Sequence, residues 1–312
     1  MLDSKVVFIS LTTRCNIRCA KCWRFDVFGS GRDVKDDVLE KIMEIFAYYK
    51  GKIIVGSGEN LISKSLKKYI DWCVTYNIKT TILTNGLNFD KYIDDKNFFN
   101  PNITWGLTMD GFYNKEIENL QIGMNIEKVK NNIKIIKEKY PNSSFYLNIT
   151  HMKNNLHSTE KLIKFAKEMN IKNVYITQLK LFEGLDDSLT KYQVNDFESD
   201  EFKSVMKKVK ILAKKLGINL YASIDNPKPT CFQNVEKISP IIHGNGNIVF
   251  CYGRDGDILG NILDENGDKV WRNHLNKLLN STIEREKWCS NCNSVLKSER
   301  GYYYIPTKQK KR

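Results

Sequence analysis

Three cysteines with metal-ligand spacing stand near the start of the sequence, where Cys15, Cys19 and Cys22 form a CxxxCxxC pattern. Thiolates at this spacing can hold three corners of a cubane iron–sulfur cluster and leave its fourth iron without a protein ligand. Structural zinc takes four ligands, usually from CxxC pairs, and no local His or Cys completes such a set. A disulfide framework does not suit a cytosolic chain with this grouping. The spacing therefore favours an iron–sulfur cluster whose open iron can bind a chelating molecule.

Four further cysteines lie in the last third of the chain: Cys231, Cys251 and the pair Cys289 and Cys292. Four thiols with one CxxC pair make a closed site in which the protein supplies every ligand. Such a site suits either zinc or an iron–sulfur cluster, and the spacing alone does not choose between them. The eighth cysteine, Cys73, lies at helical spacing from apolar residues and is predicted to belong to the core.

The elements that must position these cysteines follow from the hydrophobic pattern. Short β-branched or aromatic runs alternate with longer segments of helical period, which is typical of βα units around a parallel sheet. We expect six strands, near 5–10, 52–55, 79–84, 103–109, 145–150 and 173–179. A last helix leads to a possible seventh strand at 218–224. The first cysteine loop then follows the first strand, at the carboxyl end of the sheet, where α/β barrels carry their chemistry.

The pattern of alternating elements ends at Pro227 and Pro229, beyond which the sequence is rich in glycine and short runs. We therefore place a domain boundary near residue 225. Residues 1–225 are predicted to form the α/β domain, residues 226–300 a small cysteine-bearing module, and residues 301–312 a basic tail.

The first cysteine cluster and the strand ends resemble those of the radical S-adenosylmethionine (radical SAM) superfamily, over nearly the whole chain. The resemblance implies a partial (β/α)6 TIM-like barrel in which Cys15, Cys19 and Cys22 bind a [4Fe–4S] cluster. The amino and carboxylate groups of SAM chelate the open iron in that family, and reduction releases a 5′-deoxyadenosyl radical that abstracts hydrogen from an unactivated C–H bond. The family usually has an aromatic residue before the third cysteine, whereas this chain has Lys21.

The resemblance also implies contacts to SAM from the strand ends. Gly58 and Glu59 correspond to the family's Gly-Gly-Glu motif, in which a carboxylate meets the SAM ammonium through a charge-assisted hydrogen bond. Thr84 and Thr108 stand at common strand ends of the family, and Asn148 lies where a polar group often reaches the ribose or carboxylate of SAM. For Thr84, Thr108 and Asn148, a purely structural role at a strand end remains open.

The later cysteines resemble the shorter, twitch form of the family's SPASM module, because residues 258–262 carry an "lGNi" phrase and Trp271 precedes the CxxC pair. This resemblance implies an auxiliary [4Fe–4S] cluster held by Cys231, Cys251, Cys289 and Cys292. A fully ligated cluster cannot easily bind substrate, so it is expected to accept an electron from a substrate radical. An external one-electron reductant such as flavodoxin or ferredoxin would supply the electron that cleaves SAM.

The expected function is a radical SAM oxidoreductase of dehydrogenase type. Four-cysteine modules resemble those of enzymes that act on aminocyclitols and sugars, and the radical motif begins at Cys15, which leaves no room for an N-terminal peptide-recognition domain. We therefore expect a carbohydrate-like or other small polar substrate. Maturation of a ribosomally made peptide, by cross-linking or epimerisation, is one alternative. A non-enzymatic, zinc-stabilised module that binds nucleic acid is the other.

Composition bounds these readings. The chain has 312 residues, 41% hydrophobic and 27% charged, as in ordinary globular proteins. No apolar run approaches a membrane span and no cleavable signal is evident, so we expect a cytoplasmic protein without a membrane partner. The net charge of +13 comes from lysines that are predicted to lie on solvated faces, and no RNA-binding aromatic motif accompanies them. Four histidines, His151 among them, show no metal spacing and are expected to be structural.

Overall fold

A computed structural model describes residues 6–22, 24, 30–113, 119–179, 200–222, 240–249, 258–267, 269, 297–298 and 301–302. Cys231, Cys251, Cys289 and Cys292 lie outside these residues. The predicted auxiliary site therefore remains a prediction, as do the domain boundaries.

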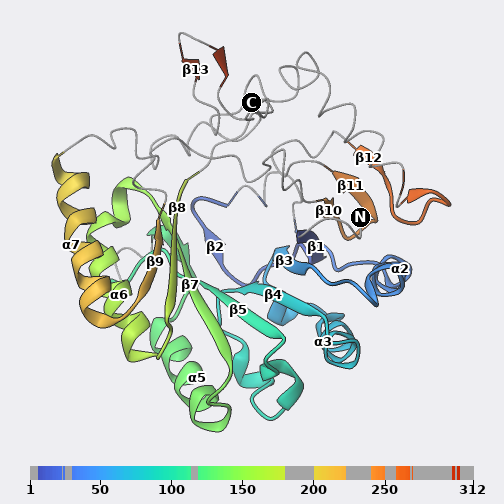
Figure 1. The fold of residues 1–312 in the computed structure, drawn as a ribbon, viewed down its shortest axis with the longest axis horizontal. Coiled ribbons are helices and arrows are strands. Elements are labelled where there is room, and N and C mark those ends of the chain that lie inside the picture. Colours follow the sequence, from blue (N-terminus) through green and yellow to red (C-terminus); the bar gives the residue numbers. More distant parts are fainter. Residues whose placement is uncertain are drawn as a thin grey trace, which may run out of the picture.

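One curved sheet organises the molecule (Figure 1). Seven of its parallel strands follow one another in the spatial order β1 (Val6–Thr12), β3 (Lys52–Ser57), β4 (Lys79–Thr84), β5 (Ile103–Thr108), β7 (Ser144–His151), β8 (Asn173–Gln178) and β9 (Asn219–Ala222). The six predicted strands and the possible seventh are all present. The fold is thus α/β with a largely parallel sheet, as predicted for a partial TIM-like barrel.

The sheet continues beyond β1 through three strands from the later part of the chain. β10 (Ile241–Ile242) pairs in parallel with β1, and β11 (Asn247–Val249) and β12 (Ile258–Asn261) follow in antiparallel order. Two small antiparallel pairs lie outside the main sheet: β2 (Arg18–Cys19) with β6 (Gln121–Ile122), and β13 (Lys297–Ser298) with β14 (Gly301–Tyr302).

Helices cover the convex side of the sheet, while β2 lies on its concave side (Figure 1). They are α2 (Asp36–Phe46), α3 (Leu66–Thr75), α5 (Ile126–Lys139), α6 (Thr159–Glu168) and α7 (Asp200–Leu216). Short 3₁₀ helices connect these elements: η1 (Asn60–Ile62), η2 (Phe89–Lys91), η3 (Lys96–Phe99) and η4 (Lys153–Ser158).

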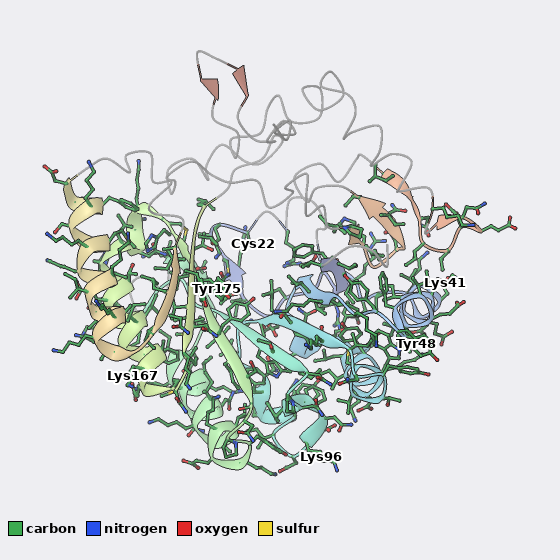
Figure 2. All side chains as sticks on the ribbon, viewed as in Figure 1. Cys22, Lys41, Tyr48, Lys96, Lys167 and Tyr175 are labelled. Carbon is green, nitrogen blue, oxygen red and sulfur yellow. The ribbon has the colours of Figure 1, made fainter. Side chains whose placement is uncertain are left out.

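Alternation along the strands explains how the sheet acquires two different faces. In β8, Val174 and Ile176 are buried with the core, whereas Tyr175 between them is 38% exposed. Successive side chains of a strand point to opposite faces. The face of Val174 and Ile176 therefore packs under the helices, and Tyr175 stands on the concave face (Figure 2).

The lysines follow the predicted pattern. Lys203, Lys207, Lys208, Lys214 and Lys215 are all exposed along α7. Such spread charge is typical of a solvated face. Among the described residues, no helix is long and apolar enough to cross a membrane.

Candidate functional site

Residues 13–22 leave β1 and carry all three cysteines of the first cluster across the carboxyl ends of the parallel strands. Cys15, Cys19 and Cys22 are free and half-buried, and Figure 2 labels Cys22 beside β2 on the concave side of the sheet. The predicted position of this loop, at the carboxyl end of the first strand, agrees with the structure.

Charged side chains fix the first half of the loop. Arg14 forms an ion pair with Asp33, with Nη2 2.7 Å from Oδ2, and donates a second hydrogen bond of 2.9 Å to the carbonyl of Ile62. The buried guanidinium of Arg24 donates to the carbonyl of Thr13. The backbone immediately before Cys15 is therefore held by groups that lie outside the loop.

The loop also lies directly against the turn that follows β3, which explains the glycine at position 58. A Cβ atom on Gly58 would lie 2.3 Å from the carbonyl oxygen of Arg14 and 2.7 Å from that of Thr12. The amide of Glu59 donates a 2.8 Å hydrogen bond to that same Arg14 carbonyl. Ser57 adopts φ 86°, a left-handed conformation that favours glycine, and it stands where the family's paired motif has its first glycine.

Glu59 is buried at the centre of these strand ends. Its Oε1 accepts from the amide of Leu61 at 3.0 Å and from the hydroxyl of Thr84 at 2.7 Å, and its Oε2 accepts from the amide of Asn85 at 2.7 Å. Burial raises the pKa of Glu59, against the effect of these hydrogen bonds. A carboxylate has about four acceptor positions, so one position on Oε2 remains for a further donor. Thr84 thus contacts Glu59, which makes it a positioning residue for that carboxylate.

A relay of amides ties the loop to the end of β4. Asn85 donates to Asn16 Oδ1 at 2.8 Å, and Asn16 donates in turn to Asn88 Oδ1 at 2.6 Å. Asn16 lies between the first two cysteines. This contact spans 69 positions in the sequence and was not predicted from it.

The second half of the loop is fastened to the segment after β5. Arg18 and Cys19 pair with Ile122 and Gln121 in the β2–β6 ladder, and the amide of Ala20 donates to the carbonyl of Leu120 at 2.9 Å. Lys21 turns inward and forms an ion pair with Asp110, with Nζ 2.6 Å from Oδ2. Lys21 is therefore not free to take the place of the aromatic residue usual at this position.

Thr108 and Asn148 are neighbours in the register of β5 and β7, and both are half-buried. The same row of the sheet continues through Tyr175 on β8 to Tyr221 on β9, whose rings stack with centroids 4.6 Å apart. The tyrosines were missed from the sequence, although the alternation of β8 marks Tyr175 as a residue of the concave face. Together the row gives that face a polar end and an aromatic end.

Burial determines the state of the free thiols. It raises the pKa of Cys15, and it raises the pKa of Cys19 to about 12. The Asp110 carboxylate raises the pKa of Cys19 further, and the Lys21 ammonium lowers it. Without a metal the thiols of Cys15 and Cys19 therefore stay protonated at neutral pH, and ligation would release these protons. Proton release on metal loading is an expected property of this site.

The donor set fits an iron–sulfur cluster better than a single zinc ion. A single zinc ion takes four protein ligands in a closed structural site, whereas a cubane cluster can be held by three thiolates that leave its fourth iron open. Three thiols on one anchored loop suit the larger group.

Two other sequence features have structural roles. Cys73 is fully buried on α3, as predicted for a core residue. Asn261, in the "lGNi" phrase, donates to Asn247 Oδ1 at 2.9 Å, and a Cβ atom on Gly246 would lie 2.5 Å from Asn261 Oδ1. This asparagine therefore helps to hold the turn between β10 and β11.

Comparison with known proteins adds sequence and structural matches. A family model described as "Radical SAM superfamily" matches residues 9–166, which is 158 of the 312 residues. A search of curated protein sequences finds no match.

Among solved structures, Streptococcus suis SuiB bound to S-adenosylmethionine is 15% identical with a TM-score of 0.67. The match covers 93% of this chain and 71% of the SuiB chain. SuiB bound to precursor peptide SuiA gives a TM-score of 0.66 at 15% identity, covering 93% and 70%. Native anSMEcpe with bound AdoMet and Cp18Cys peptide gives 0.64 at 16% identity, covering 92% and 88%. At these identities the likeness concerns the fold.

Proposed function

The chain belongs to the radical SAM superfamily, and from that premise we propose that Cys15, Cys19 and Cys22 hold a [4Fe–4S] cluster whose open iron binds SAM. One observation carries the proposal: a single loop bearing three cysteines of this spacing is fastened across the carboxyl ends of β3, β4 and β5. When bound, the cluster and SAM supply a 5′-deoxyadenosyl radical that removes a hydrogen atom from substrate. The protein's own residues bind and orient these groups.

Glu59 is the proposed partner of the SAM ammonium. The Oε2 atom of Glu59 accepts one hydrogen bond from the amide of Asn85 and has one acceptor position left for the ammonium, while Leu61 and Thr84 donate to Oε1. A carboxylate held by three donors needs little reorganisation when it accepts a charge-assisted hydrogen bond. Gly58 supports the contact by letting the cysteine loop approach β3. Thr108 and Asn148, side by side on the concave face, are proposed to contact the ribose or the carboxylate of SAM.

The reaction that we propose is an oxidation. The bound cofactors would supply the means to take one hydrogen atom, and then one electron and one proton, from the substrate. An auxiliary [4Fe–4S] cluster at Cys231, Cys251, Cys289 and Cys292 would accept that electron. An external one-electron reductant, such as flavodoxin or ferredoxin, supplies the separate electron that cleaves SAM. The buried position of Cys73 supports this outcome over epimerisation, which needs an accessible hydrogen donor.

A peptide is the substrate class that the comparisons favour. Two of the similar structures, SuiB with SuiA and anSMEcpe with Cp18Cys, contain a bound peptide, and each aligns with more than nine-tenths of this chain. The carbohydrate-like or small polar substrate predicted from the sequence remains the second candidate. It is supported by the small size of the four-cysteine module, which resembles those of enzymes that act on sugars. The products distinguish the two, since a modified peptide changes in mass when it is incubated with enzyme, SAM and reductant.

Anaerobic reconstitution tests the central proposal. We expect iron and sulfide to bind, with absorption near 400 nm, and 5′-deoxyadenosine to form after reduction with SAM. Cys19→Ala should abolish 5′-deoxyadenosine formation. Cys289→Ala should keep some SAM cleavage and yield no completed product. Zinc without iron at the first loop would refute the proposal and favour the zinc-stabilised binding module, and full turnover by Cys289→Ala would refute the electron-accepting role.

A further inference from the structure

Lys21 and Asp110 form a buried ion pair beside the cysteine loop. The Nζ atom of Lys21 lies 2.6 Å from Asp110 Oδ2 and also donates to the hydroxyl of Thr150. The Asp110 side chain has no exposed surface, and that of Lys21 is 15% exposed. The pair therefore lies in a region of low dielectric constant, where charges act strongly on their neighbours.

Asp110 is held in place by its own set of hydrogen bonds. Its Oδ1 accepts from the amide of Thr150 at 2.8 Å, its amide donates to Gln121 Oε1 at 2.8 Å, and its carbonyl accepts from Asn155 at 2.6 Å. These partners come from β6, β7 and η4. The carboxylate thus has a fixed position after β5, and Lys21 on the cysteine loop binds to it.

The pair adjoins two of the three cysteines. Lys21 directly precedes Cys22 in the sequence. Gln121, whose side chain accepts a hydrogen bond from the Asp110 amide, pairs with Cys19 in the β2–β6 ladder. Any group held by these thiols therefore lies close to one positive and one negative charge. The two charges nearly cancel while both are present.

We propose that Lys21 and Asp110 are positioning residues whose balanced charges hold the second half of the cysteine loop and set how readily its cluster accepts an electron. This inference rests on the proposed function. Reduction adds one negative charge to the cluster, so a nearby anion disfavours it and a nearby cation favours it. Removing either partner alone leaves the other uncompensated, with opposite consequences.

The sign of the effect separates this role from a purely structural one. In Lys21→Met the lone Asp110 carboxylate should lower the midpoint potential of the cluster. In Asp110→Asn the lone Lys21 ammonium should raise it. The double variant should return towards the wild-type value, and Lys21→Arg, which keeps the charge, should stay close to it. Loss of loop structure alone would shift both single variants in the same direction.

The experiment is a redox titration of the reconstituted full-length protein, followed by the EPR signal that changes when SAM is added. That response identifies the first cluster among any others present. Lys68→Met is the matched control. Lys68 on α3 forms a surface ion pair with Glu40 on α2, and this substitution removes the same charge as Lys21→Met. Its potential should equal that of wild type, since solvent and salt screen exposed charges. Iron content and thermal unfolding are measured for every variant.

Opposite shifts in the two single variants support the inference, and equal or same-sign shifts overturn it. Should Asp110→Asn fail to fold, Lys21→Met alone decides, because a potential equal to that of Lys68→Met overturns the inference. In both of these overturning outcomes the wild-type protein still cleaves SAM, so the proposed function stands. Wild-type protein that binds no iron at the loop refutes the proposed function, and the inference with it.

Discussion

Glu59→Gln is the substitution that tests the site most sharply, because Glu59 joins the ends of β3 and β4 and is also the proposed SAM contact. The wild-type carboxylate accepts three hydrogen bonds in a buried position. In the variant, the amide oxygen can keep the donors Leu61 and Thr84, while the new NH2 group faces the amide of Asn85, which is also a donor. One buried donor loses its partner, and one charge-assisted bond is lost.

The expected cost follows from these contacts. A hydrogen bond to a charged group contributes about 1.5–3 kcal/mol, and an unpaired buried donor costs about 1–3 kcal/mol. Burial raises the pKa of Glu59, so removing its charge also relieves a desolvation cost. We therefore expect Glu59→Gln to lower the free energy of unfolding by about 2 kcal/mol. Glu59→Ala, which leaves all three donors unpaired, should cost more.

Urea unfolding of the metal-free protein, followed by circular dichroism, measures this loss. Glu44→Gln, at an exposed residue of α2 that pairs with Lys41, is the control and should change stability by less than about 0.5 kcal/mol. Thr84→Val should be non-additive with Glu59→Gln, because the two residues share a hydrogen bond. Stability of Glu59→Gln equal to that of Glu44→Gln would show that these contacts do not hold the strand ends together.

Three further predictions concern the same fold. Gly58→Ala should bind less iron on reconstitution while keeping its circular dichroism spectrum, because the new methyl group would lie 2.3 Å from the Arg14 carbonyl oxygen; normal iron content would contradict the close packing of the loop on β3. Ser57→Gly should raise the free energy of unfolding by up to about 1 kcal/mol by relieving the left-handed backbone at φ 86°, and a lower stability would refute that reasoning. Burial lowers the pKa of His151 from 6.5 to about 4. The folded state then resists a proton that the unfolded state accepts, so stability is present above pH 6.5 and falls by about 1.4 kcal/mol per unit towards pH 4. His151→Gln should remove that component in urea titrations at pH 7 and pH 5, and equal pH dependence of the two proteins would exclude it.

The core explains why these perturbations should act locally. β1 and β3 pair along nearly their whole length, and apolar residues of both strands are fully buried under α2 and α3. Apart from the exposed controls on α2 and α3, the substitutions among the described residues lie at the strand ends or in the loop, so they leave this apolar packing in place. We therefore expect altered ligand binding or reduced stability in folded proteins.

The parallel strands and the position of the first cysteine cluster could be predicted from the sequence. β4 begins and ends at the predicted residues 79–84, and β9 falls inside the predicted range 218–224. These features depend on neighbouring residues, because alternation of apolar side chains records which face of a strand is buried. The three cysteines lie within eight positions, so their shared loop also follows from the sequence alone.

The contacts that hold that loop in place could be found only in the folded structure. Lys21 and Thr150 are 129 positions apart, and Asn16 and Asn85 are 69 positions apart. Two-residue strands such as β2 and β6 are too short to show alternation, so their pairing is invisible in the sequence. Contacts of this kind depend on how the curved sheet brings strand ends together. The charges beside the cysteines are therefore apparent only in the folded structure.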